Sequence, residues 1–164
     1  YIMKLKPDKL LFTLFIILIT NHVILAQRDQ GPNPGNQLNK HAIQGSVGML
    51  GVDLSAMGSY EYIVWQHKET QLATFARAGY GGYVWLAATG GGVALFQGGI
   101  LTGKQKSHFE AAAGVAYFME KDENNYLSPA ASVGYRMQKP GGHFIFRTGL
   151  GYPDGLYVGL GVSF

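Results

Sequence analysis

Five charged residues are the best candidates for chemistry in this chain, because each lies in a short segment of alternating residues. They are Glu61, Arg77, Glu110, Arg136 and Arg147. Side chains in an extended strand point alternately to opposite faces, and each of these charges shares its face with small residues. If those faces line one narrow lumen, three guanidinium groups and two carboxylates must pair, because an unpaired buried charge costs several kcal/mol. We predict a structural charge network, and the alternative is a gate or a path for a polar solute.

No enzyme-like arrangement competes with this network. Ser107, His108 and Glu110 are close in sequence, but in a strand Ser107 and His108 point to opposite faces, and no nucleophile-elbow sequence accompanies them. The glycine clusters lack the lysine-serine ending of a phosphate loop. The histidines show no metal-ligand spacing; they are His22, His41, His67, His108 and His143. The sequence predicts no catalytic residue, no cofactor and no metal site.

The composition indicates one small domain built from closely packed strands. The chain has 164 residues, of which 24 are glycine and only 14% are charged. So much glycine weakens helix interiors and suits thin strands. The formal net charge of +3 comes from scattered residues, which argues against a nucleic-acid-binding surface. There is no cysteine, so no disulfide and no lipidated cysteine is expected.

The first 26 residues are typical of a secretory signal peptide. Met3 is the expected start, a basic stretch follows it, and an apolar run covers residues 10–19. Ala26 is the expected last residue before cleavage. An uncleaved membrane anchor is the alternative, although the apolar run is short for a span of about 20 residues. Residues 27–41 are rich in proline, glycine and amides, which predicts a flexible segment.

Residues 42–164 predict an all-β fold, namely an up-and-down antiparallel barrel of about eight strands embedded in a membrane. Runs of alternating residues are separated by turn residues, and no window supports an amphipathic helix. The expected strands cover 42–51, 59–65, 71–83, 91–102, 107–118, 126–138, 143–152 and 155–164. An even number of strands of about ten residues matches the smallest closed membrane barrels.

The last ten residues give the strongest evidence for lipid contact. Leu156, Val158, Leu160, Val162 and Phe164 share one face of the expected strand, while the other face carries tyrosine, glycine and serine. The second face is too small and polar to build a core, so the aliphatic face is expected to meet lipid. Aromatic residues near strand ends are expected to form interfacial girdles; they are Tyr80, Tyr83, Trp85, Tyr117, Tyr126, Tyr135, Tyr152 and Phe164.

From residue 42 to the end, the chain resembles the small eight-stranded outer-membrane β-barrel proteins of Gram-negative bacteria, in particular uncharacterised barrels of Bacteroidetes-type genomes. The resemblance is carried by segments 59–62, 77–83, 107–115, 133–142, 146–151 and 157–164. It implies export by the general secretory route and insertion by the barrel-assembly machinery. That machinery would recognise the last strand as an assembly signal, through Tyr157, Val158, Leu160, Val162 and Phe164.

The resemblance implies a cell-outer-membrane protein that is not an enzyme and has a structural or envelope-integrity role. Outer-membrane lipids are the expected partners, and a monomer is the expected state. Three alternatives stay open: a soluble secreted barrel that binds a small apolar ligand, a small-solute pore, and a lipid-modifying barrel enzyme. The short loops argue against an adhesin.

Overall fold

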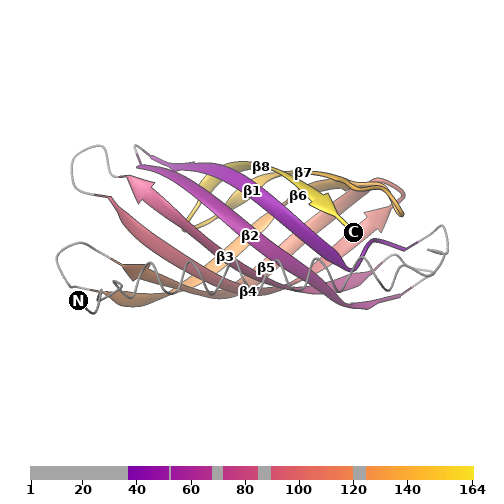
Figure 1. Cartoon of the computed structure of the whole chain (residues 1–164), viewed down its shortest axis with the longest axis horizontal. Helices are drawn as coiled ribbons and strands as arrows, with labels where there is room; N and C mark the ends of the chain where they lie inside the picture. Colours follow the sequence, from indigo (N-terminus) through magenta and orange to yellow (C-terminus); the bar gives the residue numbers. More distant parts are fainter. Residues whose placement is uncertain (1–36, 52, 68–71, 85–89, 120–124) are drawn as a thin grey trace, which may run out of the picture. The chain divides into compact units, whose positions relative to one another are not determined.

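The computed structural model describes residues 37–51, 53–67, 72–84, 90–119 and 125–164. They form an all-β, up-and-down antiparallel barrel in which each strand pairs with its neighbour in sequence and β1 pairs with β8 to close it (Figure 1). The strands are β1 (His41–Leu50), β2 (Asp53–Gln66), β3 (Ala73–Val84), β4 (Gly91–Lys104), β5 (Ser107–Met119), β6 (Tyr126–Gln138), β7 (Phe144–Tyr152) and β8 (Gly155–Ser163). The predicted closed barrel of eight strands is therefore confirmed.

The N-terminal predictions fall almost entirely outside this part of the chain. The expected signal peptide, residues 1–26 with Met3 as its start, and the first part of the expected flexible segment, 27–36, lie outside the described residues. Of its last part, residues 37–40 bond to the barrel, and His41, predicted to be flexible, is the first residue of β1. No helix in the described ranges is long and apolar enough to cross a membrane.

The second strand is longer than the alternation predicted. β2 begins at Asp53 and not at residue 59, because residues 53–58 continue the antiparallel ladder with β1 as far as the pair Leu50 and Asp53. Near its other end the register shifts between Ile63 and Trp65. This bulge leaves Val64 and Trp65 both exposed, so the strict alternation is lost there.

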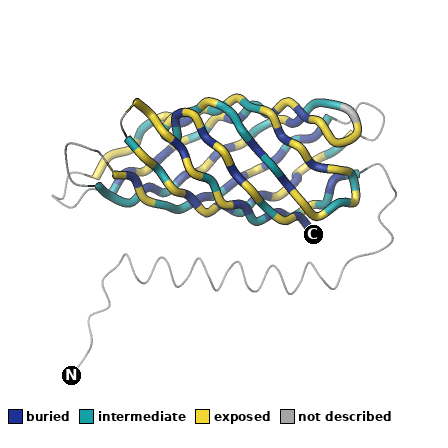
Figure 2. The backbone as a smooth tube through the Cα atoms, turned by 90° about the horizontal axis from the view of Figure 1, so that it is seen from above, coloured by how far each residue is buried: buried dark blue, intermediate teal, exposed yellow. Residues whose placement is uncertain are grey.

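The strands place uncharged, mostly apolar side chains outside, whereas the charged side chains and two apolar clusters lie inside. In β8, Leu156, Val158, Leu160 and Val162 are between 45% and 56% exposed, whereas Tyr157 and Ser163 are buried. The same alternation follows the other strands around the barrel (Figure 2). Among outward-facing strand residues whose side chains the structure describes, none is Asp, Glu, Lys or Arg. Where side chains are described, the outward strand faces thus form an uncharged surface around the barrel, which we name the outer belt.

The aromatic residues only partly follow the predicted girdles. Tyr117, Tyr126, Tyr135 and Tyr152 are exposed by about two-fifths each. The prediction that Tyr83 belongs to a girdle is wrong. Its side chain faces inward, is 8% exposed and packs edge-on against Phe118 at 5.4 Å between ring centroids. Tyr83 has the same strand parity as the inward-facing Arg77, which is why it belongs to the interior. Trp85 lies outside the described residues.

Two apolar clusters fill the interior on either side of the charged residues. One contains Met57, Tyr83, Val93, Leu95, Ala116, Phe118 and Ala130. The other contains Leu38, Ile63, Ala73, Phe75, Leu101 and Ala112. Along β2, Glu61 lies between Ile63 of the second cluster and Met57 of the first. The second cluster is near the end of the barrel where β1 begins and β8 ends, which we name the C-terminal mouth; the other end is the opposite mouth.

Interior glycines make room for larger side chains, and this predicts a sharp contrast between two positions. A Cβ on Gly149 would meet the backbone of Val133 and lie 2.7 Å from the Tyr157 hydroxyl. Gly149→Ala should therefore lower the free energy of unfolding by about 1–3 kcal/mol, because a closely packed interior resists added volume. Gly45, on the outer face of β1, has nothing within 4 Å, so Gly45→Ala should change it by less than about 0.5 kcal/mol. Denaturant titration of detergent-folded protein measures both; equal effects would contradict the packing.

Candidate functional site

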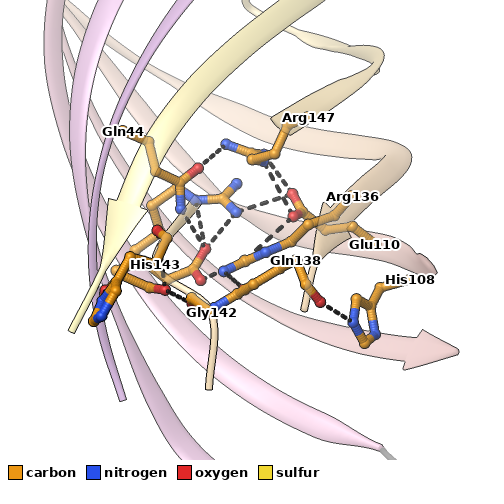
Figure 3. Close-up of polar contacts among 11 residues, drawn as sticks. Gln44, His108, Glu110, Arg136, Gln138, Gly142, His143 and Arg147 are labelled. Carbon is orange, nitrogen blue, oxygen red and sulfur yellow. Dashed lines mark hydrogen bonds and ion pairs between the residues drawn. The ribbon is translucent and has the colours of Figure 1, made fainter. Parts of the chain in front are cut away.

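The five predicted charges lie inside the barrel, where they meet from five different strands. Glu61 is on β2, Arg77 on β3, Glu110 on β5, Arg136 on β6 and Arg147 on β7. All are 5% exposed or less. Together with Gln44 of β1 and Gln138 of β6 they form a set of contacts that we name the charge network (Figure 3).

Arg77 joins the two carboxylates. Its Nη2 lies 2.6 Å from Oε2 of Glu61 and 2.9 Å from Oε1 of Glu110, and its Nε donates to the same Glu61 oxygen at 3.2 Å. Glu61 and Arg77 are direct partners across the β2–β3 ladder, so the strand register holds this pair together. The guanidinium also lies over the Phe75 ring, 4.6 Å from its centroid.

Arg147 and Gln44 complete a closed ring of contacts. Arg147 donates to both oxygens of Glu110, through Nη2 to Oε1 and through Nε to Oε2 at 3.1 Å. Its Nη1 donates to Oε1 of Gln44 at 2.9 Å, and Gln44 Nε2 donates to Oε2 of Glu61 at 3.3 Å. The ring therefore runs from Glu61 through Arg77, Glu110 and Arg147 to Gln44 and back to Glu61.

Arg136 spans this ring and connects it to the end of β6. Its Nη1 lies 2.5 Å from Oε1 of Glu61 and 3.7 Å from Oε2 of Glu110. Its Nη2 donates to Oε1 of Gln138, whose backbone carbonyl lies 3.0 Å from Nε2 of His108. Gln44 and Gln138 were not among the predicted site residues. Alternation could have identified them, because each lies an even number of residues from an inward-facing residue of its own strand.

The contacts leave the two carboxylates little capacity for catalysis. Each oxygen of Glu61 and of Glu110 accepts at least one hydrogen bond from an arginine or a glutamine. All four carboxylate oxygens are thus satisfied, whereas Nε of Arg136 and Nε2 of Gln138 have no hydrogen-bond partner among the described residues. The arrangement can therefore cross-link the barrel wall from inside, but it presents neither a free base nor an open ligand position.

Ser107 and His108 point to opposite faces of β5, as predicted from the alternation. Ser107 is exposed on the outer face, where its hydroxyl lies 2.8 Å from that of Tyr135, while His108 and Glu110 are 1% exposed and inside. Within the described ranges, no three His, Asp or Glu side chains come close enough to hold a metal ion.

A second polar feature lies at the opposite mouth, in the turn between β7 and β8. Asp154 accepts a hydrogen bond from the Ser55 hydroxyl at 3.3 Å, and burial raises the pKa of its carboxyl above the ordinary value. The turn borders a cavity of about 40 Å³. Its lining includes Leu50, Tyr83, Val93 and Phe118, so it is largely apolar. A space of this size accommodates a few water molecules rather than an organic ligand.

The residues predicted to form an assembly signal lie on β8, which closes the barrel against β1, or directly after it. Tyr157 faces inward and lies against Arg147, 5.2 Å from ring centroid to guanidinium carbon. Val158, Leu160 and Val162 face outward. Phe164 follows the last residue of β8, and its ring stacks on His41 of β1 at 5.9 Å between centroids, across the β1–β8 seam.

No protein-family model matches the chain, and a search of the curated proteins finds none that is similar to it. The functional argument consequently depends on the two faces of the barrel and on the charge network.

Proposed function

We propose that this chain is an outer-membrane β-barrel protein whose lumen is plugged by the charge network, with a structural or envelope-integrity role. The observation that carries the proposal is the outer belt. Its exposed side chains include Val47, Phe96, Leu127, Phe144 and Leu160, all more than half exposed. A soluble monomer rarely exposes apolar surface all the way around its fold, whereas a membrane barrel requires it.

The distribution of charge supports the membrane barrel over its soluble rival. A secreted barrel that binds a small apolar ligand needs an apolar interior and a charged exterior. In this chain the location of the charges is reversed. The five charges of the network are buried between the two apolar clusters, and the outward strand faces are uncharged where their side chains are described. Outer-membrane lipids are then the main partners, and contact with a second copy is not needed.

A plug explains the interior better than a pore. The interior of an eight-stranded barrel is only wide enough for its own side chains. Here those side chains form the charge network and the two apolar clusters that flank it along β2 and β3. We expect the purified protein in planar bilayers to give no steady conductance. Stable, salt-dependent current steps would support the small-solute pore.

The proposal also includes assembly and the absence of enzymatic activity. Assembly would follow export of a precursor, with the barrel-assembly machinery recognising the residues around Tyr157 and Phe164.

A lipid-modifying enzyme is the alternative if the protein has a catalytic activity. We expect the lipid A of a deletion strain to be unchanged in mass. A change in lipid A mass that corresponds to a missing or additional acyl chain would favour an enzymatic role over the structural one.

Fractionation tests the location directly. Expressed with its leader in a Gram-negative host, the protein should be recovered with the outer membrane after sarkosyl extraction. It should also migrate differently on a detergent gel before and after boiling, because closed membrane barrels resist unfolding by the detergent until heated. Recovery in the soluble periplasmic fraction would contradict the proposal.

A further inference from the structure

We propose that residues 37–40 form a built-in stopper that seals the C-terminal mouth of the barrel by seating Leu38 in its interior. This stopper segment precedes β1 and has no regular secondary structure. This inference adds to the proposed plug. It does not depend on a membrane location, because the segment limits solvent access to the interior in detergent as well as in a bilayer.

One side of the mouth holds the stopper segment through β2. The backbone N–H of Leu38 donates to Oε1 of Gln66 at 3.2 Å. The carbonyl of Lys40 accepts from the backbone N–H of Ile63 at 2.8 Å. The bulge in β2 between Ile63 and Trp65 lies between these two contacts in sequence. The end of β2 therefore bonds the stopper segment at Leu38 and at Lys40.

The other side of the mouth holds the same segment through the β6–β7 turn and the end of β8. The carbonyl of Gln37 accepts from the N–H of Gly141 at 3.1 Å. The side-chain amide of Asn39 donates to the carbonyl of Gly142 and to the hydroxyl of Ser163, each at 3.2 Å. In the closed strand order, β6 and β7 lie across the barrel from β2. Four consecutive residues thus bridge the mouth.

Leu38 is the residue that fills the mouth. Its side chain is only 4% exposed and belongs to the apolar cluster with Ile63, Ala73, Phe75, Leu101 and Ala112. These residues come from β2, β3, β4 and β5, so Leu38 contacts a seat built by half of the barrel wall. A leucine in a segment without regular structure is buried to this degree only when tertiary packing holds it.

The seat lies next to the charge network. Phe75, a member of the seat, packs on the guanidinium of Arg77, and Ala112 follows Glu110 on the same face of β5. Excluding water here strengthens the ion pairs, because their interaction is larger in a low dielectric. The stopper segment should therefore act as a dry cover over one side of the network.

Thiol accessibility tests the stopper, because the chain contains no cysteine of its own. Ala112→Cys places a single reporter in the seat, at a position that is 7% exposed. In detergent-folded protein, a charged methanethiosulfonate should modify it slowly. Adding Leu38→Asp should raise the rate at least about tenfold, because a charged side chain cannot stay in the apolar seat and the mouth opens more often.

Two further variants keep the test decisive. Leu50→Asp, at the opposite mouth, should leave the rate within about twofold, since local openings at one end need not reach the other. Asn39→Ala removes the side-chain hydrogen bonds to Gly142 of the β6–β7 turn and to Ser163 of β8, and should raise the rate about threefold even if Leu38→Asp does not fold. Heat-modifiable migration confirms the fold of each variant. A folded Leu38→Asp or Asn39→Ala protein with an unchanged rate, or a reporter that reacts fast without either change, would overturn the stopper.

Discussion

Replacing Glu110 with glutamine is expected to lower the free energy of unfolding by about 3–5 kcal/mol. Glu110 accepts hydrogen bonds from Arg77 and Arg147 and lies 3.7 Å from Arg136. A glutamine keeps the size of the side chain but removes its charge and turns an N–H donor toward guanidinium groups. Three buried cations would then share the single carboxylate of Glu61. Equilibrium unfolding in urea from lipid vesicles or detergent measures the loss.

A double-mutant cycle separates this effect from a simple packing defect. Arg147→Met removes one of the cations that Glu110 compensates, so the pair Glu110→Gln with Arg147→Met should lose less than the sum of the two single changes. Ser107→Ala, on the outer face of the same strand, is the control and should stay within about 0.5 kcal/mol of the unmodified protein. A Glu110→Gln protein that is as stable as this control would show that the network contributes nothing to the fold.

An arginine on the outer belt should destabilise the barrel almost as strongly in lipid vesicles, if the proposed membrane location is correct. Leu160 lies near the middle of β8 and is 56% exposed. Leu160→Arg is expected to cost about 2–4 kcal/mol, because a cation near the centre of the bilayer loses its hydration. In a water-soluble barrel the same change at an exposed position would cost less than about 0.5 kcal/mol. The difference in unfolding free energy between the two proteins in vesicles therefore reports what the outer face contacts.

Leu156→Arg is the matched control for this prediction. Leu156 is on the same strand and the same face and is 53% exposed, but it lies one residue beyond the β7–β8 turn that ends at Gly155. Arginine near the interface costs only about 0–1 kcal/mol, so the cost should fall toward the strand end. Equal costs at Leu156 and Leu160 would contradict a bilayer around the barrel.

The sequence was most informative where one face of a strand is consistently apolar. Every strand except β2 was predicted within two residues of its observed bounds, because the alternating runs are separated by turn residues. β2 was predicted too short, since Leu54 and Met57 put apolar residues on both of its faces and the bulge beside Val64 interrupts the pattern. Periodicity identifies a strand only when its two faces differ.

Alternation assigned the charged residues to the interior, but it did not determine their partners. Glu61 and Arg77 are direct cross-strand partners, and so are Arg136 and Arg147, although these two are both cations. The ion pairs of Arg136 with Glu61 and of Arg147 with Glu110 join strands that are not neighbours, so they depend on the closure and stagger of the whole barrel. Leu38 was missed for the same reason. Its seat is formed by residues from four strands, while the local sequence of amides and lysine predicts only an irregular segment.

The orientation of β8 is the most direct test of the account. A spin label attached to a single cysteine at each of Leu156, Val158, Leu160 and Val162 can be examined in lipid vesicles, with a label at Lys106 in the β4–β5 turn as the aqueous reference. Collisions with oxygen should greatly exceed collisions with a water-soluble nickel complex at all four outward positions, and the reverse should hold at Lys106. If the nickel complex reaches Val158 and Leu160 as freely as Lys106, the outer belt faces water and the account is wrong.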